Sequence, residues 1–302
     1  MSTKVKQKIT VILGPTASGK SNFAVILAKK FNGEIVSADS RQVYQDLNIG
    51  SNKITESEQQ NIKHYLLDIV KPDQDFSLYD WQQSTWQSID KILAKKKLAI
   101  IVGGTGLYLS SILQNYQLPA TDKELRHELN KLSLEKLIAK LKKIDPDIIK
   151  KIDSKNKIHV VRALEYAIAF HDDLSTKQKT NPCPYDYLIF GLNPDKEKLY
   201  QKINQRVDVM LKNGLLEEVE NLLAKYSKDL PALSGIGYQE IIKYLNKELS
   251  LAEAIELIKK NTRHYAKRQM TWFRRMEKQG LKISWNKSLT EAENLIKNFL
   301  KK

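Results

Sequence analysis

Short apolar runs alternate with longer segments of helical periodicity along most of this chain. The runs are rich in Ile and Val and comprise Ile9–Leu13, Glu34–Ala38, Leu98–Val102 and Tyr187–Leu192. Between them, apolar residues recur at the spacing of the buried side of a helix. Such an alternation is typical of a parallel sheet that is covered by helices on both faces. We therefore expect an α/β fold.

The pattern changes between Pro119 and about Tyr185, where every segment has helical character and no convincing strand occurs. An all-helical segment between two strands of one sheet is best explained as an insertion, and prolines at both ends favour boundaries there. We expect a core domain formed by residues 1–118 and 186–302, and an all-helical insertion domain formed by residues 119–185.

The first apolar run leads into a glycine-rich stretch, GPTASGKS, which matches the phosphate-loop pattern G-x-x-x-x-G-K-[ST] at every fixed position. In such loops, backbone N–H groups surround phosphate oxygens, the lysine adds a positive charge and the final hydroxyl ligates Mg²⁺. The alternative is a glycine turn that caps a helix beside an incidental lysine. Because strand, loop and helix follow one another, we predict phosphate binding in a phosphate-loop NTPase-like parallel sheet flanked by helices. The predicted loop residues are Gly14, Pro15, Thr16, Ala17, Ser18, Gly19, Lys20 and Ser21.

Polar and glycine residues follow two of the predicted strands. Asp39 comes directly after the second strand, at the carboxyl edge of the sheet where α/β proteins bind ligands. We interpret Asp39 as a base or a partner of Mg²⁺, and the alternative is a helix cap or turn residue. The third run, Leu98–Val102, continues into Gly103 and Gly104, where ordinary phosphate-loop NTPases place an aspartate that holds Mg²⁺. This difference argues against a simple NTPase.

The composition adds a strong positive charge to this picture. With 50 Lys and Arg against 35 Asp and Glu, the 302 residues carry a formal net charge of +15. Basic surfaces attract phosphate backbones, which favours a nucleic-acid partner, whereas a generally lysine-rich composition is the alternative. No apolar run approaches the ~20 residues of a membrane span, so we expect a cytoplasmic protein without membrane contact. The lone Cys183 cannot form an internal disulfide.

A long basic helix is predicted near the end of the chain, from Leu251 to about Met276. Placed at about 100° per residue, the basic side chains fall on one side, and the other side, which we expect to pack, carries Ile255, Ile258, Thr262, Tyr265, Gln269, Trp272 and Met276. The basic residues are Lys260, Arg263, Lys267, Arg274, Arg275 and Lys278. Between Lys259 and Lys278 the only acid is Glu277, too few for neutralisation by pairing. The pattern favours a contact with a phosphate backbone over a merely solvated helix face.

Five further motifs occur in order after the phosphate loop. They are DSRQVY at 39–44, GGTGLY at 103–108, RALE at 162–165, GIGYQE at 235–240 and KRQMTWFR at 267–274. Together with GPTASGKS, they resemble the bacterial tRNA isopentenyltransferases (IPP transferases), the family of tRNA dimethylallyltransferases, over nearly the whole chain. The resemblance implies transfer of the dimethylallyl group from dimethylallyl diphosphate to N6 of the adenosine 3′-adjacent to the anticodon of tRNA, with release of diphosphate.

The same resemblance implies roles for individual residues. Lys20 and the neighbouring amides hold the prenyl diphosphate in place of ATP, Ser21 orients Mg²⁺, and Arg206 neutralises the leaving group. Asp39 acts as the general base on the adenine amine. The helical insertion closes over the anticodon stem-loop of the tRNA, and a monomer is expected. The implied tRNA contacts are Asp39, Ser40, Arg41, Gln42, Thr105, Arg126, Ile158, His159, Val160, Val161 and Arg162. Among these, Ile158 and His159 stand where the family usually has Gln and Arg.

Three other functions remain as alternatives. An adenylate isopentenyltransferase shares the fold and the donor but uses a free nucleotide, which needs neither a helical insertion nor a basic helix. A phosphate-loop small-molecule kinase would transfer a phosphoryl group of ATP. A non-catalytic RNA-binding module would need no base at Asp39.

Overall fold

The computed structural model describes residues 6–170 and 181–301, and within these ranges the chain forms two compact units. The first unit contains residues 6–76, 84–110 and 184–301. The second unit contains residues 77–83, 111–170 and 181–183. Residues 171–180 of the predicted insertion lie outside the described residues.

A six-stranded parallel sheet forms the centre of the first unit, which confirms the predicted α/β fold. Its strands are β1 (Lys8–Leu13), β2 (Gly33–Ala38), β3 (His64–Tyr65), β4 (Leu98–Gly103), β5 (Asp186–Gly191) and β6 (Ile283–Trp285). They are ordered β3-β2-β4-β1-β5-β6 across the sheet. The apolar runs predicted the four inner strands. The two edge strands were missed, because β3 has 2 residues and β6 has 3, too few to form an apolar run.

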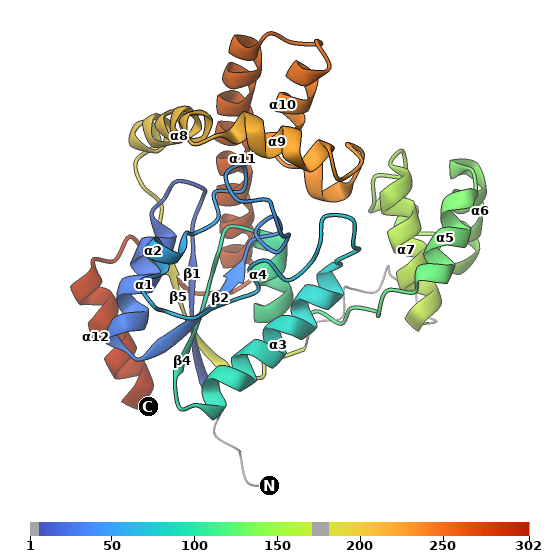
Figure 1. Ribbon diagram of the computed structural model, residues 1–302. Coiled ribbons are helices and arrows are strands. Elements are labelled where there is room, and N and C mark those ends of the chain that lie inside the picture. Colours follow the sequence, from blue (N-terminus) through green and yellow to red (C-terminus); the bar gives the residue numbers. More distant parts are fainter. Residues whose placement is uncertain (1–5, 171–180, 302) are drawn as a thin grey trace, which may run out of the picture. The chain divides into compact units, whose positions relative to one another are not determined.

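Helices cover both faces of this sheet (Figure 1). On one face lie α1 (Lys20–Lys30) and α12 (Leu289–Lys301), and on the other lies α3 (Leu78–Ala94), whose part from Ser84 on belongs to the first unit. The β strands contribute alternate side chains to the core beneath α1 and α12. This core includes Ile12, Val25, Leu27, Ile35, Ile100, Phe190 and Ile296.

A layer of helices lies beyond the carboxyl ends of the strands (Figure 1). It comprises α8 (Lys196–Lys212), α9 (Leu215–Leu223), α10 (Tyr238–Leu245) and the first part of α11 (Leu251–Lys278). Gly214, with φ +96°, permits the turn between α8 and α9. The space between this layer and the strand ends is where ligands bind in α/β proteins. None of the helices within the described ranges combines the length and the apolar character needed to cross a membrane.

The second unit has its own apolar core. It contains α5 (Lys123–Lys131), α6 (Leu134–Ile144), the short 3₁₀ helix η1 (Ile148–Lys150) and α7 (Lys157–Phe170). Buried Leu137, Leu141, Val160 and Leu164 pack together between these helices. Its secondary structure within the described residues is helical, as the sequence predicted. The helix α4 (Gly106–Leu113) runs from the first unit into the second.

Candidate active site

A cavity of about 570 Å³ lies at the carboxyl edge of the sheet in the first unit. Its walls come from the phosphate loop, the segment after β2, α8, the turn before α10, and α11. The four residues that the sequence singled out for chemistry, Lys20, Ser21, Asp39 and Arg206, all line this cavity. The fold therefore brings together residues that are separated by more than half of the chain.

The phosphate loop presents backbone donors to this cavity. Gly19 has φ +86°, a conformation that favours glycine, and α1 begins at the next residue. The first helical hydrogen bond runs from Phe23 N to Gly19 O at 3.1 Å, so the amides of residues 20–22 have no carbonyl partner within the helix. Exposed N–H groups and the positive end of the helix dipole make this turn a site for an anion.

Burial lowers the pKa of two of the cations that line the cavity, Lys20 and Arg206. Burial lowers the pKa of Lys20 to about 8, the charge of Asp39 opposes this shift, and the charge of Arg206 adds to it. Burial also lowers the pKa of Arg206, while the charge of Glu58 raises it. The guanidinium of Arg206 donates to Thr16 Oγ1 at 3.2 Å. Two partly desolvated cations at one end of the cavity favour a multiply charged anion there.

Asp39 is a turn residue, the alternative that its position allowed, and it also lines the cavity. Its Oδ1 accepts hydrogen bonds from Arg41 N at 2.9 Å and Gln42 N at 3.4 Å, so the residue shapes the turn after β2. Ser40 N donates to Thr105 Oγ1 at 3.2 Å, which ties this turn to the glycine loop after β4. Asp39 is thus a turn residue whose carboxylate is held in place at the cavity wall.

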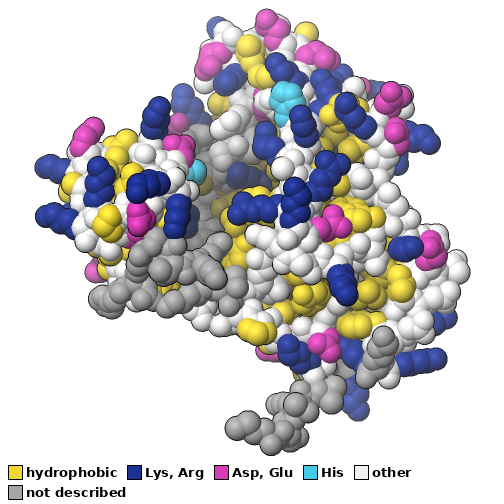
Figure 2. Space-filling model, turned by 180° about the vertical axis from the view of Figure 1, so that it is seen from behind, with side chains coloured by type: hydrophobic (Ala, Val, Ile, Leu, Met, Phe, Trp, Pro, Cys, Tyr) yellow, Lys and Arg dark blue, Asp and Glu magenta, His cyan; other side chains and the backbone are white. Residues whose placement is uncertain are grey.

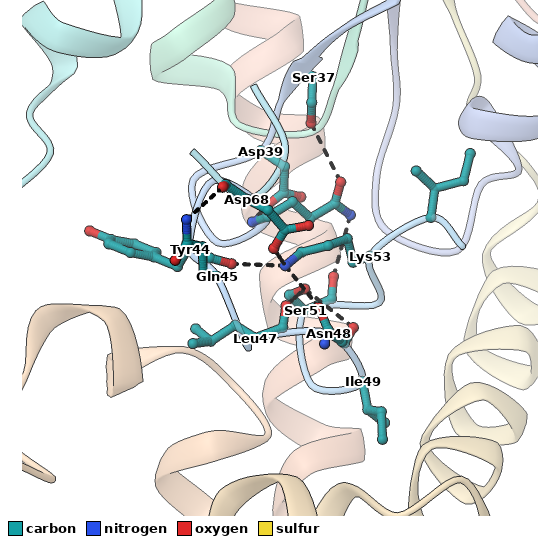
Figure 3. A network of polar contacts seen from close by, with 12 residues as sticks. Ser37, Asp39, Tyr44, Gln45, Leu47, Asn48, Ile49, Ser51, Lys53 and Asp68 are labelled. Atoms are coloured by element: carbon teal, nitrogen blue, oxygen red, sulfur yellow. Dashed lines mark hydrogen bonds and ion pairs between the residues drawn. The ribbon is translucent and has the colours of Figure 1, made fainter. Parts of the chain in front are cut away.

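The segment from Asp39 to Lys53 is held by its own polar network (Figure 3). Lys53 Nζ donates to Tyr44 O at 2.8 Å and pairs with Asp68, and its side chain is only 6% exposed. The Gln42 amide accepts from Ser37 Oγ at 3.4 Å and donates to Asn52 O at 3.1 Å. Gln42, expected to contact tRNA, thus already has partners within the protein.

Arg41, another expected tRNA contact, binds a distant segment. Its guanidinium donates to Ala232 O at 3.1 Å and to Ser234 Oγ at 3.0 Å, both in the 3₁₀ helix η3 (Pro231–Ser234). The GIGY turn follows, with Gly237 at φ +98°. Arg41 therefore holds the turn before α10 against the strand-end segment that carries Asp39.

Several residues that line the cavity were not predicted from the sequence to belong to the site. Gln269 was assigned only to the packing side of its helix, yet it bonds to the phosphate loop. Tyr265 was assigned in the same way, and burial raises its pKa to about 12, with the charge of Asp39 adding to the rise. Glu58 caps the short helix α2 (Glu56–Gln59), and His64 belongs to the unpredicted strand β3. The motif KRQMTWFR was the available signal for Gln269.

The basic side of α11 is solvent-exposed, as its periodicity predicted. Exposed cations on this helix include Lys260, Lys267, Arg268, Arg274, Arg275 and Lys278. Figure 2 shows Lys and Arg side chains gathered in a row on this side of the molecule. Glu277 accepts a hydrogen bond from Trp285 Nε1 at 2.7 Å, so the only nearby acid of the helix is used elsewhere. Arg263 differs from the others because it donates to Asn204 Oδ1 at 2.7 Å.

In the second unit, the remaining expected tRNA contacts have different environments. Ile158 is 67% exposed, and His159 and Arg162 are also exposed on α7. Val160 and Val161 are 0% and 4% exposed, so their side chains pack in the core of the unit instead of facing a partner. Nearby, Arg126 is held by Glu165 through two hydrogen bonds of 2.6 and 3.0 Å.

The cavity offers hard oxygen donors that fit Mg²⁺. Ser21 and Ser37 contribute hydroxyl groups and Asp39 a carboxylate to its lining. Within the described residues, no group of three or more His, Cys, Asp or Glu side chains is placed so that it could hold a metal ion. This donor set suits Mg²⁺, which keeps several waters and binds substrate phosphates together with one or two protein oxygens.

Fold and site together define a phosphate-loop α/β protein whose glycine-ended β4 lacks the usual metal-binding aspartate. The chain belongs to the IPP transferase family, whose pattern matches residues 42–276. It is 45% identical to a tRNA dimethylallyltransferase of Acetivibrio thermocellus, with 96% of this chain and 95% of that protein covered.

The chain is also similar to solved structures. The chain resembles a tRNA delta(2)-isopentenylpyrophosphate transferase from Staphylococcus epidermidis with a TM-score of 0.70 and 37% identity, over 98% of this chain and 99% of the other. It also resembles a eukaryotic dimethylallyltransferase acting on tRNA with a TM-score of 0.81 and 29% identity, over 94% of this chain and 75% of the other.

Proposed function

We propose that this chain is a tRNA dimethylallyltransferase. It transfers the dimethylallyl group of dimethylallyl diphosphate to N6 of the adenosine 3′-adjacent to the anticodon. The observation that carries the proposal is that the phosphate loop and the carboxylate of Asp39 line one cavity, so that a diphosphate donor and a base can meet there. Relatives of this name at 42 to 48% identity support the same activity.

The diphosphate occupies the phosphate-loop end of the cavity. Lys20 and the amides at the start of α1 hold it, and Arg206 neutralises the negative charge that grows as it leaves. Burial strengthens these interactions because water screens them less. Ser21 would hold Mg²⁺ together with the diphosphate, and the ion would add further neutralisation of the leaving group.

Asp39 carries the proton transfer. The adenine N6 attacks the allylic carbon C1, the C1–O bond breaks, and its electron pair leaves with the diphosphate. The proton of N6 passes to the Asp39 carboxylate, whose turn, held by Arg41 N and Gln42 N, keeps it oriented. An adenine in an anticodon loop must leave its stack to reach this carboxylate.

We propose that the anticodon stem-loop of the tRNA contacts residues of the first unit and of the helical unit. Ser40, Thr105, Ile158, His159 and Arg162 are the proposed contacts beside Asp39 and Arg126. The basic side of α11 supports binding of a phosphate backbone, since Glu277 is the only acid between Lys259 and Lys278. We propose a monomeric enzyme, and a cytoplasmic location follows from the tRNA substrate.

The test compares acceptors directly. Purified protein is incubated with dimethylallyl diphosphate, Mg²⁺ and either AMP or an anticodon stem-loop RNA, and the products are identified by mass spectrometry. We expect the mass of one dimethylallyl group on the RNA and none on AMP. Modification of AMP alone would support the adenylate isopentenyltransferase, and an ATP-dependent phosphorylated product would support the kinase. Mass spectrometry of tRNA nucleosides from cells that lack the protein checks the site of modification.

A further inference from the structure

Thr16 of the phosphate loop is held on two sides by distant parts of the chain. Its backbone N–H donates to Gln269 Oε1 at 2.8 Å, and its hydroxyl accepts from Arg206 Nη1 at 3.2 Å. Gln269 lies on α11, is 5% exposed, and also donates from Nε2 to Gly104 O at 2.9 Å. The oxygen and the nitrogen of this buried amide are therefore both used, one on the phosphate loop and one on the glycine loop after β4.

The glycine loop after β4 leaves room for α11. A Cβ at Gly104 would collide with Gln269 Nε2, and a Cβ at Gly106 would collide with the indole ring of Trp272, which lies nearly one turn further along α11. The indole N–H of Trp272 donates to Ser110 Oγ at 2.9 Å. Ordinary phosphate-loop NTPases carry an aspartate for Mg²⁺ at the end of this strand. In this chain, the end of β4 instead contacts a side chain of α11 that reaches on to the phosphate loop.

The position of the Arg206 guanidinium depends on this arrangement. Within residues 6–170 and 181–301, Thr16 Oγ1 is the one hydrogen-bond partner of that guanidinium. We propose that Gln269 is a positioning residue for Arg206 and acts through Thr16. By fixing the backbone of Thr16 against the end of β4, it fixes where the hydroxyl holds the guanidinium. The inference rests on the proposed function, in which Arg206 neutralises the leaving diphosphate.

A double-mutant cycle on the rate of prenyl transfer tests this role. Single-turnover rates at saturating dimethylallyl diphosphate, Mg²⁺ and stem-loop RNA are measured for the wild type, Gln269→Met, Arg206→Ala and the double variant. Methionine keeps the length of glutamine but makes neither hydrogen bond. We expect Gln269→Met to slow transfer roughly 30-fold in the wild-type background, since a small misplacement of a group that acts on the reaction can cost about 100-fold.

In the Arg206→Ala background, the same substitution should slow transfer by less than about threefold, because the guanidinium that Gln269 positions is gone. The affinity for the stem-loop RNA, measured by fluorescence anisotropy, should stay unchanged in Gln269→Met. Equal losses of rate in the two backgrounds, or a Gln269→Met variant with the wild-type rate, overturn the inference.

Two further variants separate this role from a general loss of stability. Trp272→Phe removes the neighbouring bond of α11 to Ser110 without touching the phosphate loop, and should change the rate by less than about threefold in either background. Gln269→Asn keeps an amide but is one methylene too short to bond both loops, so it should repeat the dependence on Arg206 and replaces Gln269→Met if methionine prevents folding. A loss in Trp272→Phe as large as that in Gln269→Met would overturn the inference. A wild type that transfers no dimethylallyl group to the RNA refutes the proposed function itself, whereas normal transfer with additive losses refutes only the role of Gln269.

Discussion

Asp39 and Lys20 are electrostatically coupled across the cavity. Burial lowers the pKa of Lys20 from 10.5 to about 8, and the negative charge of Asp39 opposes that shift. In the proposed reaction, one of these residues holds the leaving group and the other accepts the proton of the nucleophile. Their coupling means that the base also helps to keep the diphosphate-binding amine charged, so a substitution of either residue affects both ends of the cavity.

Asp39→Asn should reduce the rate of prenyl transfer by at least ~100-fold, because the amide cannot accept the proton of N6. The asparagine Oδ1 can still accept the hydrogen bonds of Arg41 N and Gln42 N, so the turn should persist. Single-turnover assays near pH 7 measure the rate, and fluorescence anisotropy measures the affinity for an anticodon stem-loop RNA. We expect the affinity to be largely kept. A variant that modifies RNA at the wild-type rate would exclude Asp39 as the base.

Lys20 should make the affinity of the cavity for diphosphate depend on pH, within a pH range that experiments can reach. Diphosphate binds the protonated amine, so its affinity should be constant with respect to Lys20 well below pH 8. As the pH rises through about 8, the free protein loses this proton and the affinity should fall, by up to tenfold per unit of pH. Calorimetric titrations with inorganic diphosphate from pH 6.5 to 9.5 measure the slope.

The control for that experiment is Lys20→Met, measured in the same buffers. Diphosphate loses a proton of its own in this range, and the variant reports that contribution without the lysine. The difference between the two slopes is therefore the contribution of Lys20. Equal slopes in both proteins would mean that Lys20 stays charged over the whole range or does not contact the diphosphate.

The sequence was sufficient to predict features that depend on residues close to one another along the chain. The inner strands, the phosphate loop and the two sides of α11 each follow from a short pattern, because apolar periodicity and glycine spacing act locally. The edge strand β6, by contrast, is 3 residues long and pairs with β5 from a distant part of the chain. Its existence depends on tertiary contacts that no local pattern records.

The same distinction applies to the site. Asp39 and Lys20 could be placed together because both follow parallel strands, whose carboxyl ends meet at one edge. The partners of Arg41 could not be predicted, since they lie 190 to 193 residues away in η3. The periodicity of the helix placed Gln269 on the packing side. A glutamine that is only buried and one that hydrogen-bonds to two loops would occupy the same position on the helix, so the pattern could not distinguish them. Only the structure shows that its amide contacts Thr16 and Gly104.

The basic side of α11 predicts a steep dependence of RNA binding on salt. Each phosphate contact releases counterions, so removal of Lys267, Arg274 and Arg275 together should reduce the slope of log affinity against log salt by roughly 2 units. Anisotropy titrations of the stem-loop RNA between about 50 and 200 mM KCl measure the slope. Lys297→Ala, an exposed cation on α12, is the matched control and should leave the slope nearly unchanged. A slope that is flat already in the wild type would remove this helix from the RNA-binding surface.

Glu218 on α9 should be a determinant of stability for the loop that follows the Asp39 turn. Its carboxylate accepts hydrogen bonds from the backbone N–H groups of Asn48 at 3.0 Å, Ile49 at 2.7 Å and Gly50 at 3.0 Å. It also accepts one from the hydroxyl of buried Tyr238 at 2.8 Å. Burial raises the pKa of Tyr238, and the charge of Glu218 adds to this rise. The tyrosine therefore remains a neutral donor to the carboxylate.

Glu218→Ala would leave the amides of Asn48, Ile49 and Gly50 and the hydroxyl of fully buried Tyr238 without this acceptor. Gly50 lies against the Tyr238 ring, where a Cβ would come within 2.5 Å of Cζ. An unsatisfied buried donor costs about 1 to 3 kcal/mol, whereas water can reach the exposed Asn48 and the part-buried Ile49 and Gly50, so we expect the free energy of unfolding to fall by about 2 kcal/mol. Urea denaturation measures this loss, and Glu220→Ala, on the exposed side of the same helix, should change it by less than about 0.5 kcal/mol. Equal effects of the two substitutions would show that the loop does not depend on this carboxylate, and that the segment carrying Asp39 is held mainly by Lys53 and Gln42.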